Sequence, residues 1–204
     1  MVKHMNALCF LGLASLPAHS SQLLHLQVDR QADIYQVYVE MEFKAPADKL
    51  RKILTDYANL ERLNASITTS EVIAGDIDGV VRVRTHIQNC VLFICMELRK
   101  VEDITEDEHG RIMATIVPAS SSFRSGTASW EIRSTANGSR VIHQAKLEPD
   151  VWLPPWMGTA IIKDALRREI QQSFENLECL AMADCTQRLE TDEEDDWGEL
   201  AWDS

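Results

Sequence analysis

The chain has 204 residues, of which 45% are apolar and 25% are charged, values that are ordinary for one globular domain with short extensions. A chain of this length can bury a sizeable core without needing metals or disulfides. Its formal net charge of −12 argues against a basic phosphate-binding surface, so no nucleic acid is expected as a partner.

The first 20 residues have the features of a signal peptide. Lys3 and His4 form a short basic start, and an apolar run follows from Met5 to Leu16. Pro17 ends this run, and small residues precede a cleavage point after Ser20. The run is too short to anchor the chain across a bilayer. The pattern predicts export, to a bacterial periplasm, and an ordinary buried helix is the alternative.

The next segment predicts strands followed by two short helices. Apolar and polar side chains alternate over residues 34–44, as in a half-buried strand, and a shorter strand is expected before it, around Leu24 to Val28. Pro46 opens a helix, a position where its missing N–H costs nothing. Residues 59–64 predict a second short helix.

From residue 67 to residue 147 the pattern is one of strands and turns. We expect strands at 67–74, 79–89, 93–103, 111–118, 123–134 and 139–148. Asn137-Gly138 is a strong hairpin signal, because both central positions of such a turn need positive φ. The short connections imply an antiparallel meander.

Residues 156–183 predict one long amphipathic helix, roughly 40 Å in length. Its apolar residues recur every three or four positions, at Ile162, Leu166, Ile170, Phe174, Leu177 and Ala181. This helix is the only predicted element large enough to cover the apolar face of the sheet. A curved sheet around a single helix leaves space between them, which is a natural apolar pocket.

Several stretches resemble a known family. Residues 39–73, VEMEFKAPADKLRKILTDYANLERLNASITTSEVI, are similar to the opening of START-like (SRPBCC, helix-grip) proteins of the polyketide cyclase/dehydrase and coenzyme Q-binding group. Two later stretches fit as well: Phe123-Arg124 with Gly126 and Trp130, and Arg140 to His143 followed by Pro149 and Leu153-Pro154. His143 replaces the tyrosine that is common in that group.

The resemblance covers roughly residues 33–183 and implies an α+β fold. We therefore expect a helix-grip architecture, in which a curved antiparallel sheet wraps around a long C-terminal helix and two short helices follow the first long strand. The resemblance also implies a cavity for a hydrophobic ligand, but it does not fix which ligand, because the superfamily is functionally broad.

The candidate ligand-binding residues are those expected to face this cavity. The apolar candidates lie on the first long strand and on the helix, at Val39, Met41, Phe43, Ile162, Leu166 and Ile170. If Trp130 faces inward, Arg124 and His143 are the polar candidates, and either could orient a ligand oxygen. The alternative is an arginine paired with a carboxylate and a hydrogen-bonded core histidine. Trp156 predicts either a rim for ligand entry or simple packing of the turn.

No catalytic residue, metal site or cofactor is predicted, because the sequence lacks G-x-S-x-G, H-E-x-x-H and glycine-rich phosphate loops. The favoured function is non-catalytic binding or transport of a hydrophobic small molecule of the lipid or quinone class, with transient membrane contact. Quinone rests on the resemblance alone. A cyclase- or dehydratase-type enzyme using the same cavity and a protein-interaction module are the alternatives.

Four cysteines remain after the leader, an even number that is compatible with disulfides in an exported chain. A hairpin turn at residues 89–94 would place Cys90 and Cys95 opposite each other, and we expect them to pair. Cys179 and Cys185 would then pair or stay reduced.

The C-terminal end is strongly acidic. Residues 190–204 carry eight carboxylates and no lysine or arginine, so they repel one another and stay solvated. An interaction tail anchored by Trp197, Leu200 and Trp202 is the alternative. We divide the chain into a signal peptide (1–20), a START-like domain (21–185) and an acidic disordered tail (186–204).

Overall fold

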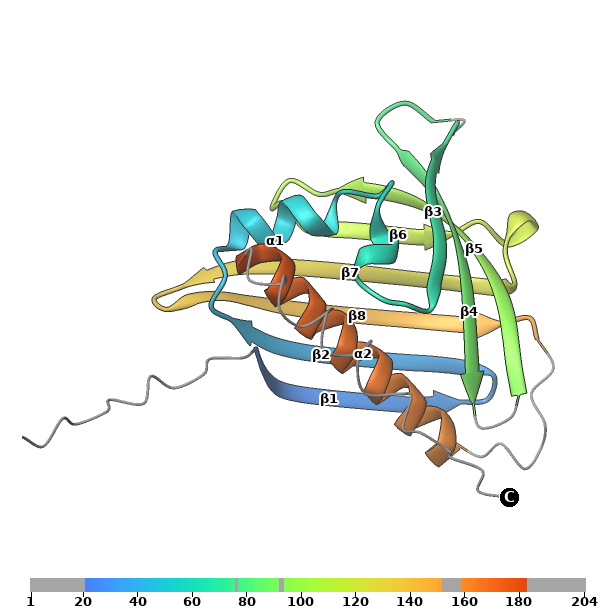
Figure 1. The fold of residues 1–204 in the computed structure, drawn as a ribbon. Coiled ribbons are helices and arrows are strands. Elements are labelled where there is room, and N and C mark those ends of the chain that lie inside the picture. The colour runs from blue at the N-terminus through green and yellow to red at the C-terminus, as the bar shows by residue number, and fades with distance from the viewer. Residues whose placement is uncertain (1–20, 76, 92–93, 152–158, 183–204) are drawn as a thin grey trace, which may run out of the picture.

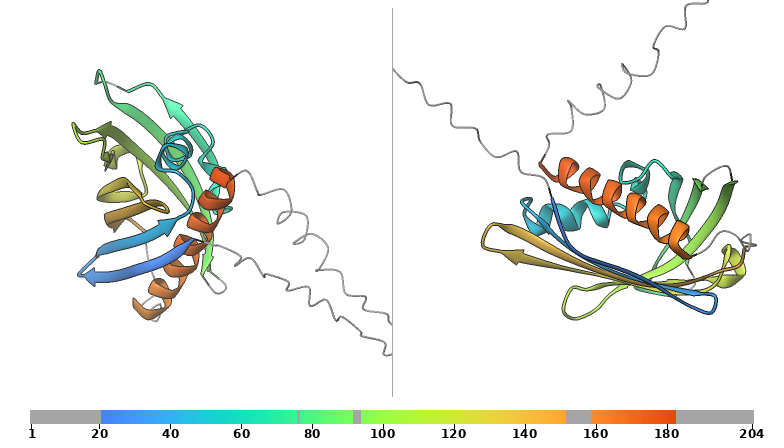
Figure 2. Two further views of the ribbon diagram at one scale, coloured as in Figure 1. Left: turned by 90° about the vertical axis from the view of Figure 1, so that its left-hand side faces the viewer. Right: turned by 90° about the horizontal axis from the view of Figure 1, so that it is seen from below.

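The computed structural model of the chain describes residues 21–75, 77–91, 94–151 and 159–182. An eight-stranded antiparallel sheet curves around one long helix, α2 (Thr159–Met182), which lies across its concave face (Figures 1 and 2). The predicted α+β fold, with a curved antiparallel sheet around a long C-terminal helix, is confirmed. No helix in the described parts of the chain has the length and apolar character needed to span a membrane.

The strands run nearly in sequence order across the sheet. They are β1 (Gln22–Gln31), β2 (Ile34–Phe43), β3 (Ile67–Ile73), β4 (Val81–Val91), β5 (Ile94–Glu106), β6 (Ile112–Ile116), β7 (Phe123–Thr135) and β8 (Gly138–Pro149). Their spatial order is β1-β2-β8-β7-β6-β5-β4-β3, so the predicted meander from β3 to β8 ends beside β2. Bulges in β1, β3 and β7 interrupt the register, and bulges increase the bending of a sheet.

Three short helical segments complete the described part of the fold. The first two, α1 (Ala47–Leu54) and the 3₁₀ turn η1 (Leu60–Arg62), lie between β2 and β3, where the two short helices were expected. A further 3₁₀ turn, η2 (Pro118–Ser120), joins β6 to β7. The predicted signal peptide, most of the segment leading into α2 and the acidic tail lie outside the described residues.

The main core lies between α2 and the central strands β2 and β8. Alternation along β2 turns Val39, Met41 and Phe43 inward, where all three are buried. The Phe43 ring lies 5.7 Å from the ring of Phe174 on α2. Each fully buried side chain of this size stabilises the fold by about 1.5–3 kcal/mol relative to exposure. This packing fixes α2 against one half of the sheet.

The β7–β8 hairpin packs against the segment that joins β2 to α1. Thr135 pairs with Gly138, so the turn is centred on Ala136 and Asn137, one residue earlier than the sequence suggested. Gly138, at φ 147°, is the single turn residue with positive φ, so the predicted turn with two positive φ values is wrong. Glycine is needed because a Cβ at this position would lie 2.1 Å from the carbonyl oxygen of Phe43.

The same β2–α1 segment also holds the C-terminal part of α2. Glu178, which is 7% exposed, accepts hydrogen bonds at Oε1 from the backbone N–H of Lys44 (3.0 Å) and of Ala45 (3.2 Å). Ser139 Oγ donates to the Ala45 carbonyl oxygen at 2.7 Å. Side chains from α2 and β8 therefore meet at one short piece of backbone, which fixes this end of the helix on the sheet.

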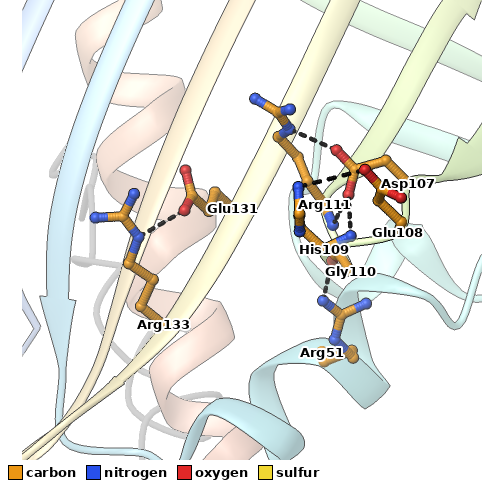
Figure 3. A network of polar contacts seen from close by, with 8 residues as sticks. All are labelled: Arg51, Asp107, Glu108, His109, Gly110, Arg111, Glu131 and Arg133. Carbon is orange, nitrogen blue, oxygen red and sulfur yellow. Dashed lines mark hydrogen bonds and ion pairs between the residues drawn. The ribbon is translucent and has the colours of Figure 1, made fainter.

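An internal ion pair and a hydrogen bond from α1 hold the β5–β6 turn (Figure 3). Arg111 Nε lies 3.0 Å from Asp107 Oδ2 within this turn, and Arg51 on α1 donates to the Gly110 carbonyl oxygen. Arg133 and Glu131 form a separate pair on β7, at 2.6 Å. Exposed pairs of this kind are worth about 0–1 kcal/mol each. The contacts of Asp107 and Gly110 have a local role in holding the turn.

The β4–β5 hairpin brings Cys90 and Cys95 directly opposite each other. The structure joins them in a disulfide, with Cα atoms 3.9 Å apart. Cys179 on α2 is also disulfide-bonded. Cys185 lies outside the described residues.

Candidate functional site

A largely apolar cavity of about 250 Å³ lies between α2, the α1–η1 region and the inner face of the sheet. Its volume is slightly below the range of about 300–1,000 Å³ that is usual for small-molecule sites. Much of its wall is aliphatic or aromatic and is formed by Leu60, Ile104, Ile112, Trp130, Ile170 and Phe174. Such a wall favours an apolar occupant, because binding restores the contacts that a void forfeits.

Three larger hollows are less suited to an apolar ligand. One, of about 490 Å³, lies on the sheet and is lined by several amide and charged side chains, including Gln36 and Lys146. Another, of about 430 Å³, runs between β1 and the start of α2 and includes Lys163 and Arg167. The third, of about 350 Å³, is lined by several charged side chains, including Asp150. All three are more open to solvent, so the cavity under α2 is the better candidate site.

An ion pair on β5 contributes polar atoms to the cavity wall. Lys100 and Glu102 occupy alternate positions of the strand, so both side chains point to the inner face. Lys100 Nζ lies 2.8 Å from Glu102 Oε2. Glu102 is only 7% exposed, and a carboxylate buried to this extent needs such a partner. Together the two charges form a neutral, polar spot in an otherwise apolar wall.

His143 on β8 adds a neutral imidazole. Its ring stacks on Trp130 with centroids 4.6 Å apart, and Nδ1 lies 3.1 Å from the carbonyl oxygen of Ser129. A carbonyl oxygen can only accept, so we assign the proton to Nδ1 and a lone pair to Nε2. Burial lowers the pKa of His143 to about 4; the Ser129 hydrogen bond opposes this shift and the charge of Lys100 reinforces it. The imidazole is therefore uncharged at neutral pH.

Hydrogen bonds to α2 hold the wall formed by residues 63–67. The buried Asn64 donates through Nδ2 to Ser173 Oγ (2.7 Å) and to the Glu169 carbonyl oxygen (3.2 Å). Ser66 Oγ donates to Glu169 Oε2 at 2.8 Å. Asn176 Nδ2 donates to the carbonyl oxygen of Leu63 at 3.1 Å. These contacts keep the helix at a fixed distance from the η1–β3 connection.

The structure places some of the predicted site residues at this cavity and others elsewhere. Trp130, His143 and Ile170 line it. Val39, Met41 and Phe43 lie in the neighbouring core. Ile162 and Leu166 lie nearer the N-terminal end of α2 and are not among the described lining residues. Trp156 lies outside the described residues.

The placement of Arg124 differs from the sequence-based expectation. Its side chain is 54% exposed and pairs with Asp150 (3.0 Å) and Glu148 (3.7 Å). A register shift between Phe123 and Ser125 breaks the alternation that was extrapolated from Trp130. Phe123 is buried in place of Arg124. The arginine is therefore paired with carboxylates at the surface, which was the alternative to a position in the cavity.

Sequence reasoning missed Lys100, Glu102 and Asn64. Charged residues on a strand are usually read as its solvated face, and Asn64 as the end of a short helix. One signal was available, because Lys100 and Glu102 share their strand face with the apolar Leu98 and Ile104. A charged pair on an apolar face indicates burial with a partner.

Residues 35–181 match the sequence model of a family described as polyketide cyclase / dehydrase and lipid transport. The chain belongs to this family. None of the curated protein sequences compared with the chain matches it.

Several solved structures have the same fold as this chain. The Zhui aromatase/cyclase from Streptomyces sp. R1128 has 12% identity and a TM-score of 0.60, over 76% of this chain and 97% of that chain. A STAR-related lipid transfer protein fragment from Xanthomonas axonopodis has 15% identity and a TM-score of 0.53, over 74% and 98%. A START superfamily protein from Mycobacterium smegmatis has 15% identity and a TM-score of 0.54, over 74% and 97%. At these identities the likeness shows the fold alone. With the family match, it confirms the START-like resemblance.

Proposed function

We propose that the protein binds and carries an apolar small molecule in the cavity between α2 and the sheet. The observation that carries this proposal is the largely apolar wall of that cavity. Side chains from α1, η1, α2 and five strands form this wall. The family description, which includes lipid transport, supports the same function. The volume of about 250 Å³ favours a compact ligand, such as a small lipid or the ring of a quinone, over a whole phospholipid.

Filling the cavity tests this function. In an Ile170→Trp variant the larger ring would occupy space that the ligand needs, while the position remains apolar. We expect binding of the neutral fluorescent probe N-phenyl-1-naphthylamine to weaken by about tenfold or more, which corresponds to about 1.4 kcal/mol. Fluorescence titration measures the change.

The matched control is Gln171→Trp, which adds the same side chain at the next, exposed position of α2. It should leave probe binding unchanged within about twofold, because this position is not part of the described cavity lining. Equal binding by wild type and Ile170→Trp would show that the probe does not use this cavity.

A second candidate function is acid–base catalysis of the cyclase or dehydratase type. His143 favours it, because a neutral imidazole at the lining of an apolar cavity can act as a base. A ligand recovered from the cavity distinguishes the two functions. A carrier returns it unchanged, whereas an enzyme converts it and loses this conversion in a His143→Gln variant.

A further inference from the structure

The polar atoms of the cavity wall restrict the chemistry of the ligand. Glu102 Oε2 forms an ion pair with Lys100 Nζ, but Glu102 Oε1 has no hydrogen-bond partner among the described residues. Lys100 Nζ has three N–H groups and contacts only Glu102 in the described parts of the chain. His143 Nε2 also has no partner there. These three side chains therefore offer one donor group and two acceptors to whatever occupies the cavity. The Tyr57 hydroxyl and the second carboxylate oxygen of Glu169 are further polar atoms of the lining.

Building on the proposed function, we infer that the cavity selects a neutral apolar molecule carrying a hydroxyl group, which accepts a hydrogen bond from Lys100 and donates one to Glu102. A hydroxyl is the smallest group that both donates and accepts. It can therefore bridge the two ends of the ion pair without breaking it. A ketone, an ether or an ester lacks the donor and leaves the Glu102 oxygen unpaired.

A free carboxylate is disfavoured for an electrostatic reason. The charge of Lys100 is already compensated by Glu102 at 2.8 Å, so a second carboxylate would enter a site without net positive charge. It would also lose its hydration in a largely apolar wall. Glu169, a further acidic residue at the lining, adds to this repulsion. An ammonium group would likewise lose its hydration in this wall, and beside Glu102 it would lie next to the charge of Lys100.

Competition between matched naphthalene derivatives tests the inference. 2-Naphthol, naphthalene-2-carboxylate and 2-methoxynaphthalene share one apolar body and differ in the polar group. We measure how each displaces N-phenyl-1-naphthylamine from the wild-type protein at pH 7. We expect 2-naphthol to bind about tenfold or more tightly than either of the other two, because each of them leaves a wall group unpaired or repelled.

A Glu102→Gln variant tests the role of the ion pair directly. Without the carboxylate, Lys100 carries an uncompensated charge, so naphthalene-2-carboxylate should bind about tenfold more tightly than it binds to wild type. 2-Naphthol should lose its advantage. Glu97→Gln is the matched control; it removes an exposed carboxylate from the same strand, outside the described cavity lining, and should keep 2-naphthol as the preferred ligand.

The outcomes separate the inference from the proposed function. If wild type binds the probe but binds the three competitors with equal affinity, or prefers the carboxylate, the hydroxyl inference is wrong. The carrier function is not contradicted by that result. Absence of probe binding to wild type overturns both. If Glu102→Gln fails to fold, the wild-type order of affinities still decides between a hydroxyl and the other groups.

Discussion

Replacing Gly138 with alanine is expected to lower the free energy of unfolding by about 3 kcal/mol or more. Gly138 has φ 147°, a conformation that L-residues rarely adopt. The added Cβ would also lie 2.1 Å from the Phe43 carbonyl oxygen and 2.7 Å from the Cα of Lys44. Both contacts are to backbone atoms, so no side-chain rotation relieves them. Urea unfolding followed by circular dichroism measures the loss.

Gly79→Ala is the matched control for this substitution. Gly79 has a positive φ of 78°, but nothing lies within 4 Å of the position where its Cβ would be. This substitution should lower the free energy of unfolding by about 1–2 kcal/mol, because only the positive φ is unfavourable for alanine. If both variants lose the same stability, the close approach of the β7–β8 hairpin to the β2–α1 segment contributes nothing, contrary to the packing described above.

The second large effect is expected for Glu178→Leu. The substitution leaves the backbone N–H groups of Lys44 and Ala45 without their acceptor, and Ala45 is fully buried. An unsatisfied buried donor costs about 1–3 kcal/mol, so we expect a loss of about 3 kcal/mol. The measurement is again the free energy of unfolding in urea.

Two further variants define the cause of this effect. Glu178→Gln keeps an amide oxygen in place of Oε1 and should recover about half or more of the loss. Glu175→Leu removes a carboxylate one turn earlier on α2, where the group contacts only the exposed Gln171 in the described structure, and should cost less than about 0.5 kcal/mol. A loss in Glu175→Leu equal to that in Glu178→Leu would contradict a specific role for the buried hydrogen bonds.

The elements with strong periodicity could be predicted from the sequence. The alternation of 34–44 correctly placed the inward side chains of β2, and the spacing of apolar residues in 156–183 predicted α2. Both patterns depend on residues close in sequence, and both elements bury one continuous face. Local physics therefore decides their structure.

The site itself could be predicted only in part. Ile162, Leu166, Ile170 and Phe174 have the same helical spacing, but α1 and η1 cover only part of α2, and this decides which of them border the cavity. The position of Arg124 depends on a bulge in the pairing of β7 with β8, which the alternation within one strand does not reveal. The cavity lining and the position of Arg124 therefore depend on packing between distant segments, which sequence periodicity does not predict.

Native mass spectrometry of the full chain tests most directly whether the cavity carries an apolar small molecule. We predict that wild type, purified without detergent, either retains one neutral small molecule or takes up one molecule of N-phenyl-1-naphthylamine, and that Ile170→Trp does neither. A wild-type spectrum that shows only the polypeptide mass, before and after incubation with the probe, would contradict the carrier function. Equal uptake by wild type and Ile170→Trp would place the binding elsewhere than between α2 and the sheet.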